Sequence, residues 1–208
     1  MRLLTLLTIG FLTGMPLLAA QSEAHEAHEH GVANLTLAQS GEKLLLSIHS
    51  PAYNVFGFEH APVTEAEKAL VKTHLQALSS GKQIDGKLLI RFNAEAQCEL
   101  KSVDVDNPFH AQAEARTEAN EAATHHDDAD HDAHHDAHHD AHHEHHHHAD
   151  IDADYSFTCK APLDLSSLDL TGLFMSWQHL EQVRAQWVVN NKQSAATLSR
   201  QNTSALLK

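Results

Sequence analysis

The chain has 208 residues, and its 28 acidic side chains outnumber its 14 basic ones, which gives a formal net charge of −14 at pH 7 with its 21 histidines neutral. This balance excludes nucleic acid as the expected partner, because binding to phosphates rests on Lys and Arg. It fits a protein that binds cations, or one whose charge serves solubility alone.

The first 20 residues have the pattern of a secretory signal peptide. Arg2 precedes an apolar stretch over residues 3–18, and Ala20 ends a pair of small residues suited to cleavage. A transmembrane anchor is the alternative, but the stretch is short for a span and is interrupted by glycine and proline. Cleavage after Ala20 and cleavage after Ala24 both fit. We therefore expect a periplasmic protein with no membrane span in its mature form.

A His-rich segment, residues 21–30, would open the mature chain. His25, His28 and His30 fall within six residues and form a candidate metal cluster. The alternative is a frayed polar terminus without a fixed role. We favour metal binding, because the same residue types fill a longer tract in the middle of the chain.

Alternating apolar residues predict two strands, at residues 32–38 and 44–49, joined by a turn into a hairpin. Residues 51–62 are expected to form an irregular connection. His49 and His60 lie near this corner, and we expect each to be an ordinary structural or surface histidine rather than a metal ligand.

A helix is predicted between Thr64 and Gly81. Thr64 and Glu67 have the spacing of a capping box, apolar residues follow at helical intervals, and Gly81 is a typical C-terminal stop. His74 falls on the apolar face, where we expect it to be a packed side chain.

Further elements are predicted along the rest of the chain. Strands are expected at residues 86–92, 98–105, 155–159 and 182–190, with 195–199 as a candidate for one more, and a turn or short helix near 166–178. The resulting fold class is α+β: an antiparallel sheet with one or two covering helices, in a single domain over residues 31–208. A long disordered loop rich in His and Asp is expected at residues 107–151, since so long a loop is either functional or disordered.

The chain has two cysteines, Cys98 and Cys159. One disulfide is the default expectation, because an exported protein enters an oxidising compartment. A pair of thiolate metal ligands, or one reactive thiol, is the alternative. If the two cysteines face each other, antiparallel pairing puts Leu100 opposite Phe157, and the bridge staples the base of the long loop.

Residues 125–148 carry the strongest functional signal. Of these 24 residues, 13 are His, 7 are Asp or Glu and 4 are Ala, so the tract cannot build an apolar core. Neutral imidazole binds zinc, copper and nickel, and carboxylates add negative charge and partners for the second ring nitrogen. The unit His-His-Asp-Ala recurs at 134–137 and 138–141, a four-residue period that would place imidazoles on one helical stripe.

The predicted metal ligands are the three N-terminal histidines and every histidine of this tract. The latter are His125, His126, His131, His134, His135, His138, His139, His142, His143, His145, His146, His147 and His148. Zn²⁺ is the expected ion, with Ni²⁺ or Cu²⁺ as alternatives, since such ligands alone do not select the metal.

Three other interpretations of the tract compete with metal capture. An expression tag is usually terminal and is not interleaved with acids, and a solvated acidic linker would contain its histidines by chance. Residues 143–147 also match the H-E-x-x-H pattern of zinc proteases. Such a match is expected by chance in a tract this rich in His, and a protease needs a packed helix and a third ligand.

Several motifs together resemble a known family. They are His-Glu-His-Gly at 28–31, Gly-Phe-Glu-His-Ala-Pro at 57–62, the His/Asp tract, and Tyr-Ser-Phe-Thr-Cys at 155–159. In this order they are similar to the ZrgA-like periplasmic zinc-binding proteins of Gram-negative bacteria. The resemblance implies a zinc-regulated periplasmic protein that assists high-affinity zinc uptake together with an ABC transporter. It brings no fixed set of metal ligands with it.

The sequence thus predicts a periplasmic protein, not an enzyme, that captures Zn²⁺ and passes it toward uptake. A nickel or copper buffer or resistance protein is the alternative within the same class. A metal-dependent hydrolase is the alternative from another class. It would need a preformed pocket with a positioned base and an open metal position, and the segments predicted to be ordered contain no isolated His/Asp/Glu group of that kind.

Overall fold

The computed structural model describes residues 29–109 and 149–207. The predicted signal peptide, two of the three N-terminal histidines and the whole tract 125–148 lie outside these ranges. The described residues are called the folded body below.

The folded body is built on a six-stranded sheet with the order β4-β5-β2-β1-β7-β8. Its strands, in chain order, are β1 (Val32–Ser40), β2 (Lys43–Pro51), β4 (Cys98–Val105), β5 (Asp150–Cys159), β7 (Gln182–Val189) and β8 (Lys192–Ser199). The predicted hairpin, the two strands that flank the loop and the two strands near the C-terminus are all confirmed.

One pair of neighbouring strands differs from the predicted antiparallel sheet. β1 and β7 run parallel, with Val32 opposite Gln182 and Ala38 opposite Val188, whereas the other neighbours are antiparallel. A long stretch of chain separates β1 from β7, so no tight turn forces them to run in opposite directions. The α+β class is confirmed, with a mixed sheet.

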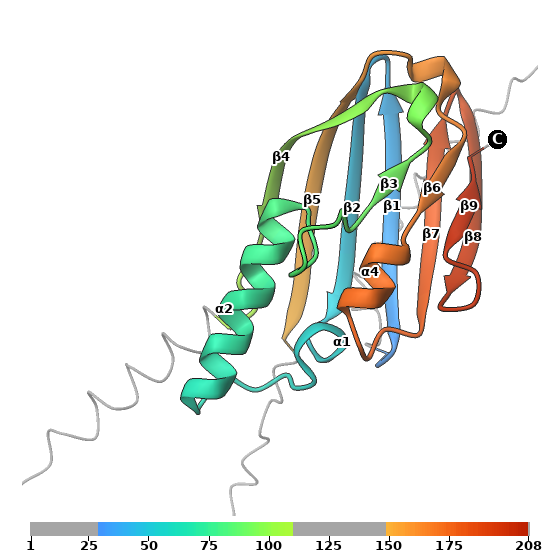
Figure 1. Cartoon of the computed structure of the whole chain (residues 1–208). Helices are drawn as coiled ribbons and strands as arrows, with labels where there is room; N and C mark the ends of the chain where they lie inside the picture. Colours follow the sequence, from blue (N-terminus) through green and yellow to red (C-terminus); the bar gives the residue numbers. More distant parts are fainter. Residues whose placement is uncertain (1–28, 110–148, 208) are drawn as a thin grey trace, which may run out of the picture.

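A second, small sheet and three helices lie over one face of the large sheet (Figure 1). The small sheet has the order β3-β6-β9, and two 3₁₀ turns lie in the connections from β3 to β4 and from β5 to β6. Their bounds are β3 (Arg91–Phe92), β6 (Ser167–Asp169), β9 (Ser204–Leu206), α1 (Tyr53–Phe56), α2 (Glu65–Ser80), α4 (Thr171–Ser176), η1 (Ala94–Ala96) and η2 (Pro162–Asp164).

The core lies between the large sheet and this covering layer. Strand side chains alternate between the two faces of a sheet, so every second residue enters the core. In β2, Leu44, Leu46 and Ile48 are no more than 1% exposed. Trp177, just after α4, is equally buried and belongs to the same core.

Helix α2 has the ends that the sequence predicts. The hydroxyl of Thr64 accepts from the N–H of Glu67, and the carboxylate of Glu67 accepts from the N–H of Thr64. Gly81 has left-handed geometry, with φ +67°, and its N–H donates to the carbonyl of Leu78. None of the helices in the described part of the chain is long and apolar enough to cross a membrane.

The strand predicted at residues 86–92 is wrong for most of its length, because only Arg91 and Phe92 pair as β3. Leu89 and Ile90 are consecutive and are both buried, which is incompatible with the alternation of a strand over one core. The N–H of Leu89 donates instead to the carbonyl of Gly81. The part of the segment before Arg91 therefore forms turns rather than a strand.

The large sheet has two ends of different character. The loop end carries the start of β1, the end of β2, the end of β4 and the start of β5, since Pro51 pairs with Asp150 and Val105 with Ala153. The opposite, disulfide end carries Cys98 and Cys159, which are bonded to each other. The predicted disulfide and the pairing of Leu100 with Phe157 are confirmed.

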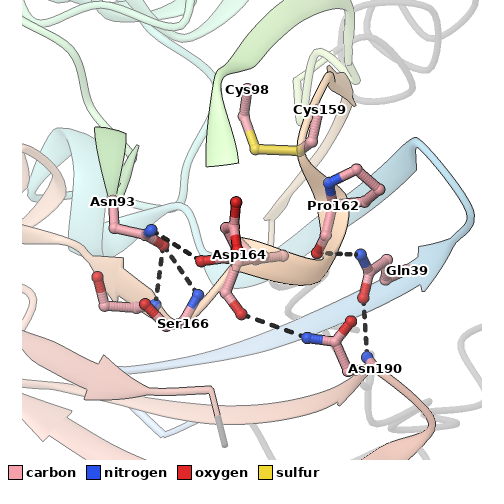
Figure 2. Close-up of a disulfide and its surroundings, with 10 residues drawn as sticks. Gln39, Asn93, Cys98, Cys159, Pro162, Asp164, Ser166 and Asn190 are labelled. Carbon is pink, nitrogen blue, oxygen red and sulfur yellow. Dashed lines mark hydrogen bonds between the residues drawn. A yellow bond between two sulfur atoms is a disulfide. The ribbon is translucent and has the colours of Figure 1, made fainter. Parts of the chain in front are cut away.

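The predicted place of the bridge at the base of the loop is wrong. The antiparallel β4–β5 ladder runs from Cys98 paired with Cys159 to Val105 paired with Ala153, so the whole ladder separates the bridge from the loop. Figure 2 shows the bridge near Gln39, whose side-chain amide joins β1 to its surroundings. It donates to the carbonyl of Pro162 at 2.8 Å and accepts from the N–H of Asn190 at 2.8 Å.

Removing the disulfide should lower the free energy of unfolding by up to about 4 kcal/mol, because the bridge restricts the unfolded chain over a sequence separation of 61 residues. The measurement is urea unfolding of the wild type and of the Cys98→Ala/Cys159→Ala variant under oxidising conditions. Under a strong reductant the two proteins should unfold alike, which is the control. Equal stability under oxidising conditions would contradict this role of the bridge.

Candidate metal-binding end of the sheet

One of the predicted metal ligands, His30, falls inside the folded body. The structure therefore does not test the other predicted ligands. Among residues 29–109 and 149–207, no three His, Cys, Asp or Glu side chains converge closely enough to form a ready metal site. The arrangement around His30, and the point where the loop leaves the sheet, show what the folded body contributes.

The ring of His30 is paired with a carboxylate. Its Nε2 lies 3.0 Å from Oε1 of Glu59, and its ring stacks on Tyr53 with centroids 4.3 Å apart. The two partners differ in exposure, since 54% of the His30 side chain but 16% of the Glu59 side chain is accessible to water. The pair joins two of the sequence motifs, 28–31 and 57–62, which are far apart in the chain.

Asn54 holds these two segments together. Its side chain is fully buried; Oδ1 accepts from the N–H of Gly31 at 2.7 Å, and Nδ2 donates to the carbonyl of Val32 at 2.9 Å. Nδ2 also donates to the hydroxyl of Ser50 at 3.0 Å. Buried polar groups are stable only when such partners are present. The amide thus fixes the backbone directly after His30 against α1.

Two glycines let the neighbouring chains approach closely. Gly31, with φ +85°, lies against the side chain of Glu181, and Gly57, with φ +81°, lies against the ring of His179. A Cβ on Gly57 would be 3.0 Å from Nε2 of His179. Glycine adopts this left-handed conformation without strain, so both contacts depend on it.

His179 is a histidine of this region that the sequence analysis missed. Its ring lies against Tyr53 with centroids 4.8 Å apart, so Tyr53 contacts both His179 and His30. These three rings, with Glu181 and Arg200, line part of a pocket of about 660 Å³. No sequence motif points to His179, because it stands alone between α4 and β7.

Arg200 fixes the chain that carries His179. Its guanidinium donates to the carbonyls of Phe174 and Trp177, both at 2.7 Å, and to the carbonyl of Gln178 at 2.6 Å. These carbonyls lie at the C-terminal end of α4 and just after it. Carbonyls at the end of a helix have no N–H partner within the helix. The planar fork of donors suits such a set of acceptors.

Both flanks of the long loop are anchored at α1. Phe109, which is 4% exposed, packs with ring centroids 5.6 Å from Phe56 and 5.9 Å from Phe58. On the other flank, the carbonyl of Ala149 accepts from the N–H of Ala52 at 2.8 Å. The short segment 52–60 therefore holds both flanks of the loop as well as the chain around His30. β5 begins at Asp150, slightly before the predicted loop boundary.

His74 is a packed side chain, as predicted, and the exposed ring of His60 also contacts an aromatic residue. The ring of His60 stacks on Phe58 with centroids 4.9 Å apart. His74 meets Phe56 edge-on at 6.0 Å, and partial burial lowers the pKa of its imidazole, which favours the neutral form. Both rings extend the aromatic cluster around Phe109.

A second imidazole–carboxylate pair lies on the outer face of the sheet. Nδ1 of His49 in β2 is 2.9 Å from Oδ1 of Asp152 in β5, and the two residues are direct cross-strand partners. Both side chains are well exposed, at 39% and 56%. Pairs of this kind are common around bound zinc, where a carboxylate orients a ligand imidazole. The prediction that His49 is an ordinary structural histidine is not tested by this contact.

Comparison with known protein families gave a match. The family described as "ZrgA family zinc uptake protein" matches residues 27–207, which is nearly the whole chain. No curated protein matches this chain.

Replacing Asn54 with Ala should lower the free energy of unfolding by about 2–4 kcal/mol, because the N–H of Gly31 and the carbonyl of Val32 lose their buried partner. Asn93→Ala is the matched control: Asn93 also bonds several backbone groups, but it is half-buried, and water can replace it. Urea unfolding of the two variants measures the difference. Equal losses would argue against a special role for Asn54.

Proposed function

The chain belongs to the ZrgA family of zinc uptake proteins, and from this premise we propose that it captures Zn²⁺ through the histidines of residues 125–148 and passes the ion to the components of an ABC transporter. The family is one of uptake proteins and not of enzymes. Zinc is here the cargo of the protein rather than a resident cofactor.

The observation that carries this proposal is the way the loop joins the folded body. The tract lies in the loop between two neighbouring strands, β4 and β5. Both flanks of this loop are anchored at the segment 52–60. The described residues by themselves form a continuous buried core on the covered face of the sheet. A metal-binding insertion at this point can therefore load and release ions without disturbing the packing that keeps the protein folded.

The composition of the tract suits capture and exchange. Its 13 histidines and 7 acids offer many alternative ligand sets, unlike the fixed tetrahedral set of a structural zinc site. The ion can therefore move between neighbouring sets without leaving the tract. The predicted ligands His25 and His28 precede His30, so the N-terminal cluster would start from the same end of the sheet.

The periplasm is the proposed location. The N-terminal 20 residues have the pattern of a signal peptide, and the Cys98–Cys159 bridge fits an oxidising compartment. Protein in this compartment can meet zinc before it crosses the inner membrane, which is where a transporter partner would receive it.

Replacing residues 110–148 with a short Gly/Ser linker should leave a cooperatively folding protein that has lost most of its zinc capacity. Shortening the loop makes its closure cheaper by less than about 1 kcal/mol per halving of length, so stability should be preserved. The measurements are zinc stoichiometry by calorimetry and the unfolding transition.

A full-length variant with the 13 histidines of the tract changed to Asn is the control, because it keeps the length and the acids. It should lose zinc as the linker variant does. An unchanged stoichiometry in both would place the main zinc site outside the tract. Competition with nickel and copper in the wild type would reveal a buffer for those metals, since copper binds such ligands more tightly than zinc.

Zinc binding by the wild type should fall steeply between about pH 7.5 and pH 5.5, because unperturbed imidazoles protonate near pH 6.5 and protons then compete with the metal. Neighbouring carboxylates favour imidazolium, so the loss should begin at a higher pH than for free imidazole. Calorimetry at the two pH values measures the change. Unchanged affinity at the lower pH would assign the metal to carboxylates.

A further inference from the structure

We propose that His30 and Glu59 form a zinc site on the folded body itself, with Glu59 as its carboxylate ligand. The inference rests on the proposed function, because it takes the same ion, but it assigns a residue outside both His-rich segments. It concerns a contact between two described side chains.

The two donor atoms lie close to the separation that a shared zinc ion requires. Nε2 of His30 and Oε1 of Glu59 are 3.0 Å apart. In a tetrahedral zinc site with ligands at about 2.0–2.1 Å, two neighbouring ligand atoms are about 3.3 Å apart. A shift of a few tenths of an ångström would therefore allow a zinc ion to replace the shared proton.

Burial of the Glu59 carboxylate also favours a bound cation. The Glu59 side chain is 16% exposed, and a carboxylate largely removed from water is stabilised by a cation beside it. A zinc ion bound by both groups would supply such a charge.

Both ligands are held in place before any metal arrives. The residue after His30 is fixed by the buried amide of Asn54, and Tyr53 stacks on the imidazole ring. Glu59 follows the turn at Gly57 and the Phe58 ring that packs on Phe109. Such support lowers the cost of ordering the ligands on binding.

Two protein ligands leave coordination positions open. No third His, Cys, Asp or Glu side chain of the folded body converges on the pair. Water or an incoming donor group would therefore complete the coordination shell of a zinc ion bound here. Such a site binds weakly compared with a closed four-ligand site. This suits a transfer position, beside the pocket lined by Tyr53 and His179.

The His49–Asp152 pair offers a matched comparison. Its donor atoms are 2.9 Å apart, almost the same as for His30 and Glu59, but Asp152 is 56% exposed where Glu59 is 16% exposed. If distance alone selected zinc, the two pairs would bind alike. If burial and support matter, the site at Glu59 binds zinc first.

The test is titration of the full-length protein with zinc chloride, followed by NMR of the backbone amides of Gly31 and Gly57 and by calorimetry. In the wild type and in Asp152→Asn, zinc should shift both amides. In Glu59→Gln, which keeps the size of the side chain and its acceptor oxygen, the same shift should need at least about tenfold more zinc. His30→Gln should behave as Glu59→Gln does, and it serves if the Glu59 variant fails to fold.

Each outcome separates this site from the proposed function. Equal shifts in the wild type and both site variants would overturn the role of His30 and Glu59. Calorimetric zinc binding by the wild type without shifts at Gly31 and Gly57 would also overturn it, while leaving capture by the tract intact. No zinc binding at all would overturn both. Loss of the shift in Asp152→Asn as well would also overturn the proposal, because the shift at Gly31 and Gly57 would then depend on a carboxylate outside the His30–Glu59 pair.

Discussion

The arrangement of the whole loop end depends on one buried amide. Asn54 accepts from the N–H of Gly31 and donates to the carbonyl of Val32, so it fixes α1 against the start of β1. Around it, the segment 52–60 packs on Phe109, bonds the carbonyl of Ala149 and carries Glu59. One short piece of chain thereby places the approach to the N-terminal histidines and both flanks of the His/Asp loop at the same end of the sheet.

This arrangement separates folding from metal exchange. The core is apolar, runs along the covered face of the sheet and is secured at the far end by the Cys98–Cys159 bridge. Small metallo-domains often fold only when the metal is bound, because the ion supplies their folding free energy. Here the apolar core and the disulfide supply it, so the proposed zinc-binding groups would be free to exchange the ion. The proposed transfer of the ion requires that independence.

Local patterns predicted most of the fold, and the failures have physical causes. The capping box at Thr64 and the alternation in β2 and β7 are local signals, and all are confirmed. The parallel pairing of β1 with β7 depends on tertiary packing, which local patterns do not contain. Residues 86–92 have an apolar pattern that resembles a strand, but two consecutive residues of this segment are buried. Asn54, Glu59 and His179 were missed as members of one region, because a lone polar residue gives no sign of its distant partners.

The most direct test of this account is to locate the bound metal ion on the fold. Co²⁺, a paramagnetic ion with ligand preferences close to those of zinc, can be added to the full-length protein while its backbone amides are followed by NMR. The account predicts loss of signal at the loop end, at Gly31, Ala52 and Ala149, with Gly41 and Lys160 at the disulfide end unaffected. Signal loss centred on the disulfide end, or spread evenly over the sheet, would contradict it.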